Sequence, residues 1–285
     1  MDIFGILSMI GGLALFLYGM EAMGAGLSKL SGGRMERLLE KLTSKRIMAV
    51  LLGAGVTAVI QSSSATTVMV VGFVNSGIMK LNQAVGIIMG ANIGTTITSW
   101  LLSLTGIQGS SFILKMLKPS SFSPILAIVG IIFIMFTKDE KKKDIGGIFL
   151  GFAILMYGME AMSGAVAPLA DNEKFTGILT MFSNPILGLL AGTILTAVIQ
   201  SSSASVGILQ TLAMRGIVNW RSAIFITLGQ NIGTCITAIL SSAGANKTAK
   251  RAAVIHLSFN VLGAAIYGVI MTIFFGIFPD RKSTR

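Results

Sequence analysis

The amino-acid sequence predicts an all-α membrane protein with an inverted-topology repeat, in which each half holds three transmembrane helices and one re-entrant hairpin. Composition is the first reason: 53% of the 285 residues are hydrophobic and 12% are charged, whereas soluble domains carry roughly twice that charged fraction. The mean hydropathy of +0.82 reflects apolar runs along most of the chain, which is typical of a multi-pass membrane protein. An internal repeat and two polar blocks inside apolar sequence are the other two reasons.

The repeat is visible as three pairs of matching blocks. The pairs are 57–65 with 196–204, 18–23 with 157–162, and 90–98 with 229–237. The first two pairs are identical and the third differs at two positions, and every pair has the same spacing of 139 residues. A constant spacing indicates two copies of one unit. We therefore divide the chain into repeat 1, residues 1–138, and repeat 2, residues 139–285.

The first half begins with an apolar span over about residues 3–27. A basic segment, 28–46, follows, and its apolar residues recur at helical spacing, which predicts an amphipathic helix along the membrane interface. A hairpin is expected over about 47–79. A broken helix is expected over 84–104, because glycines and polar side chains within it weaken a helix. A third span over 122–137 completes the half.

The hairpin prediction rests on length. The apolar arms 47–60 and 68–79 contain 14 and 12 residues, which reach roughly 21 and 18 Å as helices, short of a hydrocarbon core of about 30 Å. A polar block lies between them. Two half-length arms with a polar tip describe a re-entrant hairpin, which is tolerated where protein or a water-filled cavity surrounds the tip. The alternative is one tilted helix through 47–70.

The second half repeats the same order of elements. Its predicted parts are a span over 145–167, a polar loop over 168–184, a hairpin over about 185–218, a broken helix over 223–241, a loop over 242–252 and a last span over 253–278. Three spans and a hairpin that returns to its own side make an odd number of crossings. The second copy is therefore expected upside down relative to the first.

The distribution of basic residues agrees with this inversion. Segment 28–46 holds six Lys and Arg residues, and its counterpart 168–184 holds one. With 28–46 in the cytoplasm, most of the basic residues face the cytoplasm and both termini lie outside it. The net charge of +11 is accounted for by these short loops, so no nucleic-acid partner is expected.

The polar blocks predict an ion site. Hydroxyl and carboxamide groups both donate and accept hydrogen bonds, and a broken helix exposes free N–H groups on one arm and free C=O groups on the other. Free N–H groups at helix N-termini attract oxyanions, and freed carbonyl, hydroxyl and amide oxygens suit a small hard cation such as sodium. Neither tip contains Lys or Arg, which favours a co-bound cation as the neutralising partner. Alternatively, these small-residue blocks are helix-packing faces.

The candidate ligands come from the two tips and the two breaks. The candidate substrate ligands are Gln61, Ser62, Ser63, Ser64, Thr66, Gln200, Ser201, Ser202, Ser203 and Ser205. The candidate sodium ligands are Ser64, Thr67, Asn92, Thr95, Thr96, Ser203, Asn231, Thr234 and Thr237. Because inverted hairpins converge near the midplane, one composite site is expected rather than one per repeat.

Other ionisable groups are few. Glu21 and Glu160 are embedded acids at equivalent positions, and we expect them to brace the hairpins, with a proton relay as the alternative. His256 and Asn260 lie one turn apart and are expected to pack. One histidine cannot serve two serine blocks, which argues against a serine hydrolase. The single cysteine, Cys235, excludes an intramolecular disulfide and a cysteine metal cluster.

At the blocks that begin at Gln61 and Gln200 and at Asn92 and Asn231, the chain resembles the type II sodium-dependent phosphate cotransporter family, in its bacterial branch. The resemblance covers essentially the whole chain. It implies a transporter, and no enzyme, that takes up inorganic phosphate with sodium by an elevator-like movement of the hairpin-bearing core. It further implies that phosphate and sodium contact the hairpin tips and helix breaks, that the protein lies in the cell (inner) membrane, and that sodium is the coupling ion with no other cofactor.

Bacterial relatives in this family often continue with a further span and a soluble regulatory domain, whereas this chain ends at Arg285. Some animal relatives carry an extra acidic residue after the first break, which tunes the sodium stoichiometry, and residues 99–114 here contain none. Electroneutral coupling is therefore an open expectation. Transport of another oxyanion or a dicarboxylate, a phosphate channel, an exporter and a sensor subunit remain alternatives. A homodimer is among the oligomeric states left open.

Overall fold

The computed structural model describes residues 3–31, 46–103, 119–169 and 181–278, and every regular element within them is a helix. Five helical stretches in this part of the chain are long and apolar enough to cross a membrane. They are Ile3–Leu27 in α1 (Ile3–Ser31), Leu81–Ser103 (α5), Glu140–Ala165 in α8 (Glu140–Val166), Trp220–Ser241 (α12, Trp220–Gly233, with α13, Cys235–Ser241) and Lys247–Ile277 (α14). The protein is therefore a multi-pass membrane protein that is helical in the part of the chain that the structure describes.

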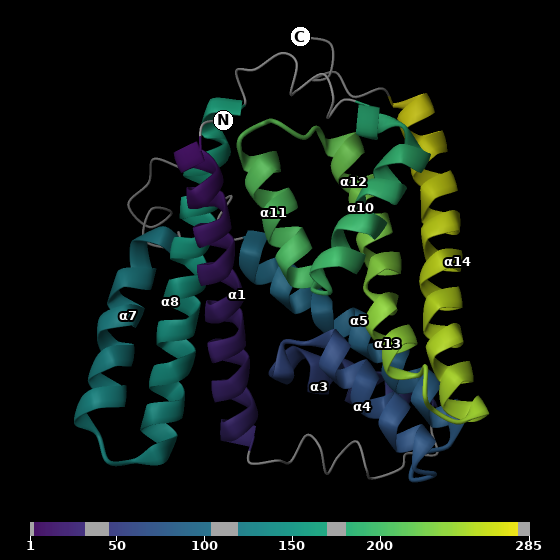
Figure 1. Cartoon of the computed structure of the whole chain (residues 1–285), viewed down its shortest axis with the longest axis horizontal. Helices are drawn as coiled ribbons and strands as arrows, with labels where there is room; N and C mark the ends of the chain where they lie inside the picture. Colours follow the sequence, from purple (N-terminus) through teal and green to yellow (C-terminus); the bar gives the residue numbers. More distant parts are fainter. Residues whose placement is uncertain (1–2, 32–45, 104–118, 170–180, 279–285) are drawn as a thin grey trace.

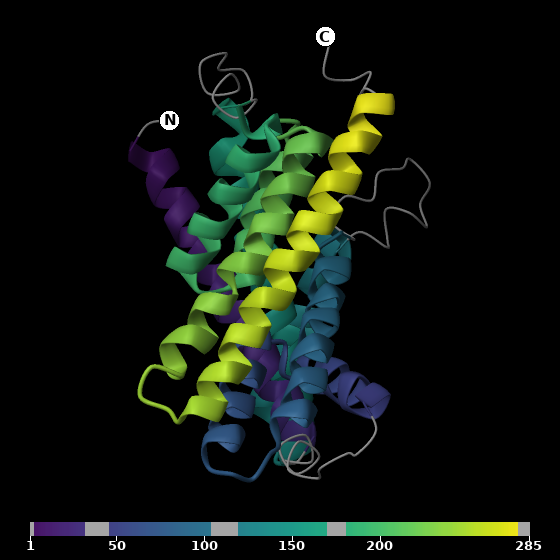
Figure 2. The same ribbon diagram turned by 90° about the vertical axis from the view of Figure 1, so that its right-hand side faces the viewer.

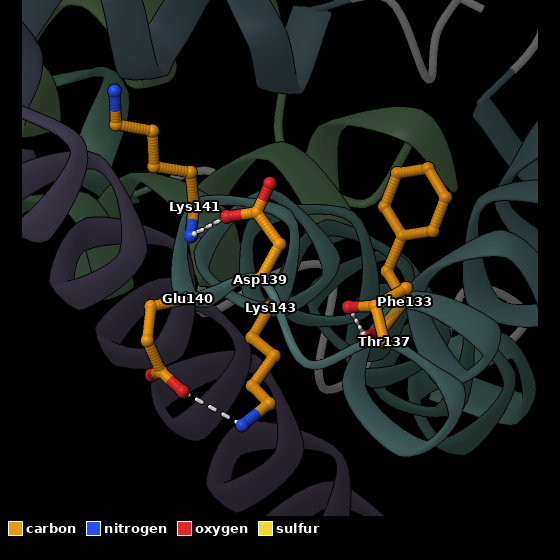
Figure 3. Close-up of polar contacts among 6 residues, drawn as sticks. All are labelled: Phe133, Thr137, Asp139, Glu140, Lys141 and Lys143. Carbon is orange, nitrogen blue, oxygen red and sulfur yellow. Dashed lines mark hydrogen bonds and ion pairs between the residues drawn. The ribbon is translucent and has the colours of Figure 1, made fainter.

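The remaining predicted span, over 122–137, is shorter than the other five. It corresponds to α7, Pro119–Phe136, whose 18 residues reach about 27 Å. A tight turn joins α7 to α8 (Figure 3): Thr137 Oγ1 donates to the Phe133 carbonyl at 2.7 Å, and the Asp139 carboxylate accepts from the Lys141 amide at 2.9 Å. These side chains provide hydrogen-bond partners for a carbonyl group at the end of α7 and an amide group at the beginning of α8.

Helices α1 and α8 pack against each other through glycines (Figure 1). A Cβ at Gly12 would lie 2.9 Å from the Gly158 carbonyl oxygen, and a Cβ at Gly19 would lie 2.5 Å from the Gly151 carbonyl oxygen. Pairs 12–158 and 19–151 run in opposite order along the two helices, so the helices are antiparallel. The absence of side chains lets the backbones approach closely, which is a common way for membrane helices to associate.

Both polar blocks lie where two short helices meet. In the first half these are α3 (Arg46–Ile60) and α4 (Ser63–Asn75), and in the second α10 (Pro185–Ile199) and α11 (Ser202–Met214). Thr57 Oγ1 donates to Thr66 Oγ1 at 3.0 Å, although nine residues of continuous helix would span about 13.5 Å. The chain therefore doubles back at this block, and the alternative of one tilted helix is wrong. An equivalent bond of 2.9 Å joins Thr196 to Ser205.

The break predicted within 84–104 is absent, because α5 runs unbroken from Leu81 to Ser103. The glycines that suggested a break serve close packing instead: a Cβ at Gly90 would overlap the Val50 carbonyl oxygen of α3. The hydroxyl of Thr95 bonds to a carbonyl of its own helix at 3.0 Å. In the second half a single residue, Thr234, separates α12 from α13, and its amide still donates to the Gln230 carbonyl at 3.1 Å. The predicted break is thus absent in the first half and present in the second, where it falls between α12 and α13.

Helix α14 lies along α4, α5, α12 and α13 (Figure 2). It begins at Lys247, earlier than predicted, so the preceding loop covers 242–246 instead of 242–252. Asn75, at the end of α4, accepts a hydrogen bond from the Asn246 amide at 2.8 Å and ties this loop to the first hairpin. Large apolar side chains such as Ile266, Ile270 and Ile273 are exposed on α14, as expected for a face in contact with lipid. The predicted interfacial helix over 28–46 falls largely outside the described residues, as does most of the polar loop 168–184.

Candidate functional site

The two hairpin tips and α1 line a cavity of about 530 Å³. In Figure 1, hairpin α10–α11 and hairpin α3–α4 approach each other from opposite ends of the molecule beside α1. The residues that line the cavity are Leu17, Met20, Glu21, Gly24, Ala25, Ile60, Gln61, Ser62, Ser63, Ser64, Gln200, Ser201, Ser202 and Ser203. Two polar blocks 139 residues apart in the chain thus face one space.

Each tip turns at a glutamine in a left-handed conformation. Gln61 has φ 58° and Gln200 has φ 57°, and this region costs a residue with a side chain about 1–2 kcal/mol. The next residue is extended and caps the following helix: Ser62 Oγ accepts from the Ala65 amide at 3.1 Å, and Ser201 Oγ accepts from the Ala204 amide at 3.2 Å. Backbone strain of this kind is concentrated at functional sites.

Helices α4 and α11 therefore both begin at the cavity. The first two amides of each helix, at Ser63 and Ser64 and at Ser202 and Ser203, have no acceptor within the helix. The positive ends of two helix dipoles also meet there. Among the described residues that line the cavity, Glu21 alone is charged, so an anion in it would be held by amides, hydroxyls and dipoles.

The two glutamines differ in how firmly they are held. Gln61 is 7% exposed, accepts a hydrogen bond from Thr98 Oγ1 at 2.8 Å and donates to the Ala58 carbonyl. Gln200 is exposed, and its side chain makes no hydrogen bond to any described residue. Thr237, the counterpart of Thr98, bonds instead to the Thr234 carbonyl. One tip is fixed to α5, and the other presents a free carboxamide to the cavity.

A second, smaller chamber of about 140 Å³ lies between α4, α5, α11 and α12. Its lining residues are Ser63, Asn92, Thr95, Thr96, Ser99, Ser202, Val206, Thr227, Gln230, Asn231 and Thr234. Ser63 and Ser202 line both spaces. None of these side chains is ionisable at neutral pH, and their oxygens suit a monovalent hard cation better than calcium or magnesium, which favour carboxylates.

Gln230 is the most unusual member of this chamber. It is 1% exposed, and neither Oε1 nor Nε2 finds a hydrogen-bond partner in the described structure. A buried carboxamide without partners costs free energy of a few kcal/mol. The sequence contains a signal for it, because Gln230 replaces Ala91 at one of the two positions where blocks 90–98 and 229–237 differ. Sequence reasoning missed it, together with Ser99 and Thr227.

Most predicted ligands face one of the two spaces, and four do not. Thr66 and Ser205 make the bonds across their own hairpins. Thr67 bonds to the Ser64 carbonyl at 3.0 Å, and Thr237 makes the helical bond described above. Ser64 and Ser203 line the larger cavity, not the chamber in which their predicted role as sodium ligands would place them. The four residues outside both spaces brace the hairpins and helices that carry the site.

Asn260 links the chamber to α14. Asn92 Nδ2 donates to Asn260 Oδ1 at 3.4 Å, and Asn260 Nδ2 donates to the His256 carbonyl at 3.0 Å. Asn260 therefore does more than pack as expected, because it also contacts Asn92, which lines the chamber. His256 is fully buried. Within the part of the chain that the structure describes, no cluster of His, Cys, Asp and Glu could hold a metal ion.

The two embedded acids do not brace the hairpins as expected. Neither Glu21 nor Glu160 forms a hydrogen bond or ion pair with any described residue. Both are exposed. Glu21 lines the larger cavity, and its counterpart Glu160 does not.

Comparison with known proteins identifies relatives over most of the chain. The family model described as Na+/Pi-cotransporter matches residues 15–164 and, a second time, residues 154–284. YqeW of Bacillus subtilis, an uncharacterised protein, is 32% identical over 255 residues, which cover 89% of this chain and 78% of that protein. YjbB of Escherichia coli K12, named provisionally as an inorganic phosphate export protein, is 29% identical over 262 residues, 92% of this chain and 46% of that protein.

A more distant relative is sodium-dependent phosphate transport protein 2A of Rattus norvegicus, which is 33% identical over 99 residues, 34% of this chain and 15% of that protein. The chain thus spans about half the length of the YjbB proteins that it matches. No solved structure matches it.

Proposed function

This chain belongs to the Na+/Pi-cotransporter family, and from this premise we propose that it is a sodium-coupled symporter of inorganic phosphate. The observation that carries the proposal is the cavity of about 530 Å³ into which the N-termini of α4 and α11 both open. Two helix N-termini and six serines form a site for an oxyanion without any Lys or Arg.

Phosphate would be held jointly by both tips. It presents four oxygens, and a single tip supplies two free amides, a few hydroxyls and one carboxamide. An anion bound by one tip would remain partly desolvated and unpaired, at a cost of several kcal/mol. Ser63 and Ser202 are placed to matter most, because each lines the cavity and the smaller chamber.

Sodium would occupy the chamber between Asn92, Gln230 and Asn231. Its neutral oxygens can replace a hydration shell without the carboxylates that divalent cations demand. A cation there also lies beside the helix N-termini that hold the anion and supplies the positive charge that the larger cavity lacks. The two ions would then stabilise each other, which is the basis of coupled binding.

An inverted-topology arrangement is part of the proposal. Gly12 faces Gly158, which is the counterpart of Gly19, and Gly19 faces Gly151, which is the counterpart of Gly12. Two equivalent helices that exchange partners in this way are related by a two-fold axis, which supports repeats of opposite orientation. In the transport cycle, the hairpin-bearing helices would move as a body relative to α1, α7 and α8 in an elevator-like step.

Phosphate export is a second candidate, favoured by the provisional naming of the YjbB relatives as export proteins. The same site serves both directions, because a coupled transporter runs according to the gradients imposed on it. Uptake of labelled phosphate into proteoliposomes therefore tests the proposal. An inward sodium gradient should drive concentrative, saturable uptake, and potassium or choline should not.

Calorimetry of phosphate binding to the purified protein in saturating sodium tests the composite site. Ser63→Ala and Ser202→Ala should each reduce phosphate binding severely, and the double variant should be little worse than either single one. Ser76→Ala, at the far end of α4, serves as the control. Uptake that is indifferent to sodium would contradict symport, and two phosphates bound per chain in calorimetry would contradict the shared site.

A further inference from the structure

Glu21 stands at the centre of the α1 face that lines the larger cavity. The α1 residues that line it are Leu17, Met20, Glu21, Gly24 and Ala25, which fall at the spacing of one helical face. Gly24, one turn beyond Glu21, lies against the first hairpin, since a Cβ there would come within 2.7 Å of the Ile60 carbonyl oxygen. Ile60 immediately precedes the tip residue Gln61. Glu21 thus lies on the α1 wall of the cavity that both serine blocks also line, one helical turn from the residue that contacts the first tip.

The charge of this side chain is not compensated. Glu21 makes no hydrogen bond or ion pair with any described residue, and no other described residue that lines the cavity is charged. A carboxylate that braced the fold would contact a neighbouring donor or cation, whereas the exposed Glu21 side chain contacts neither among the described residues. The geometry leaves Glu21 available to something that enters the cavity.

A carboxylate and a phosphate in one cavity of this size repel each other. The two charges would lie within one screening length of each other, so dissolved salt screens the repulsion only in part. A cation between them converts the repulsion into two attractive contacts. A carboxylate oxygen, serine hydroxyls and phosphate oxygens together form an oxygen-rich ligand set of the kind that hard cations prefer.

We propose that the Glu21 carboxylate is a ligand for a coupling sodium ion that binds in the larger cavity, between α1 and the anion. This inference rests on the proposed function. Besides the sodium position proposed in the neutral chamber, it adds a second position in the larger cavity, where one ligand is charged. It makes Glu21 the residue that weakens phosphate binding when the cation is absent. Glu160 has the same residue type in the same six-residue block but does not line the cavity, and it provides a matched control.

The test is calorimetric titration of inorganic phosphate into purified full-length protein at a series of sodium concentrations, with choline as the balancing cation. In sodium-free solution Glu21→Gln should bind phosphate about tenfold more tightly than the wild type, because the repulsion is removed. The slope of log Kd against log sodium concentration should decrease by about one in this variant, because one linked cation is lost. Glu21→Asp, which keeps the charge, and Glu160→Gln should both follow the wild type.

A gain of affinity cannot result from misfolding, and Glu21→Ala provides a second neutral variant if Glu21→Gln is not recovered as a monodisperse protein. An unchanged sodium dependence in the neutral variants, or an equal effect of Glu160→Gln, overturns the inference. The inference also fails if acidification replaces sodium in supporting phosphate binding to the wild type, while the neutral variants lose this pH dependence and keep their sodium dependence. The carboxylate would then bind a proton instead of sodium. If the wild type binds and transports phosphate without regard to sodium, the proposed symport fails, and that result is distinguishable from all of these.

Discussion

The glutamines at the two tips show how single residues shape the site. Glycine would adopt the left-handed conformation of Gln61 and Gln200 without strain, yet a side chain is present at both positions. At Gln61 the side chain is used to anchor the tip, through its bond with Thr98 of α5. At Gln200 the carboxamide remains free to meet a ligand. Glycine would remove the strain at both positions, but it would also remove the Gln61–Thr98 contact and the Gln200 carboxamide that lines the cavity.

Gln230 gives a residue-scale prediction. Its two side-chain polar atoms have no partner in the described structure and face a chamber of neutral oxygens. Gln230→Ala, which introduces the residue found at the equivalent position in repeat 1, should weaken sodium activation of transport about tenfold, since a lost ligand costs about 1–2 kcal/mol. The measurement is the sodium concentration that gives half-maximal phosphate uptake.

Gln210→Ala is the matched control for this variant, because Gln210 lies on the neighbouring helix α11 outside the chamber. Unchanged sodium activation in Gln230→Ala would show that the carboxamide does not contact the ion. Loss of the protein's thermal stability in Gln230→Ala would be unexpected, since removal of an unpartnered buried polar group relieves a cost.

At the scale of helices, glycines decide which elements lie in contact. Gly53 and Gly90 bring α3 against α5, and Gly192 and Gly229 do the same for α10 against α12. The hairpin arms are too short to cross the membrane alone, so each depends on its long neighbour for burial. Close backbone contact along these pairs fixes the tip at the level of the chamber residues on α5 and α12.

Gly90→Ala tests this role. A Cβ at Gly90 would overlap the Val50 carbonyl oxygen, a backbone atom that cannot rotate away. We expect a loss of stability of about 1–3 kcal/mol from overpacking, seen as a lower midpoint of thermal unfolding in detergent. Gly55→Ala is the control, because a Cβ there meets nothing within 4 Å and alanine favours the helix. Equal midpoints for the two variants would contradict the packing role.

At the scale of the whole molecule, the proposed two-fold relation predicts opposite orientation of equivalent residues. Ser76 and Arg215 follow α4 and α11, are separated by the repeat spacing of 139 residues, and are exposed. Single cysteines at these positions, in a Cys235→Ala background, should react with an impermeant thiol reagent from opposite sides of the membrane. Labelling of both from the same side would contradict the inverted repeat.

Much of the architecture follows from one-dimensional features of the sequence. The membrane class follows from composition, and the two halves follow from blocks at one spacing. The hairpin arms follow from apolar runs that are too short for a bilayer. The expected positions of the spans, such as 3–27 and 145–167, agree with α1 and α8. These properties depend on local residue type and length, so they can be predicted without knowledge of which helices touch.

What the tertiary structure decided depends on which helix faces which. Thr66 and Ser63 are both hydroxyl residues of one tip, yet one bonds across the hairpin and the other lines the cavities. Gly90 suggested a break and proved to be a packing contact. Glu21 and Glu160 are identical in sequence context, and α1 alone brings its acid to the cavity. Residue type determines what a side chain can bind, and the packing of helices distant in sequence determines whether it meets a ligand, a neighbour or lipid.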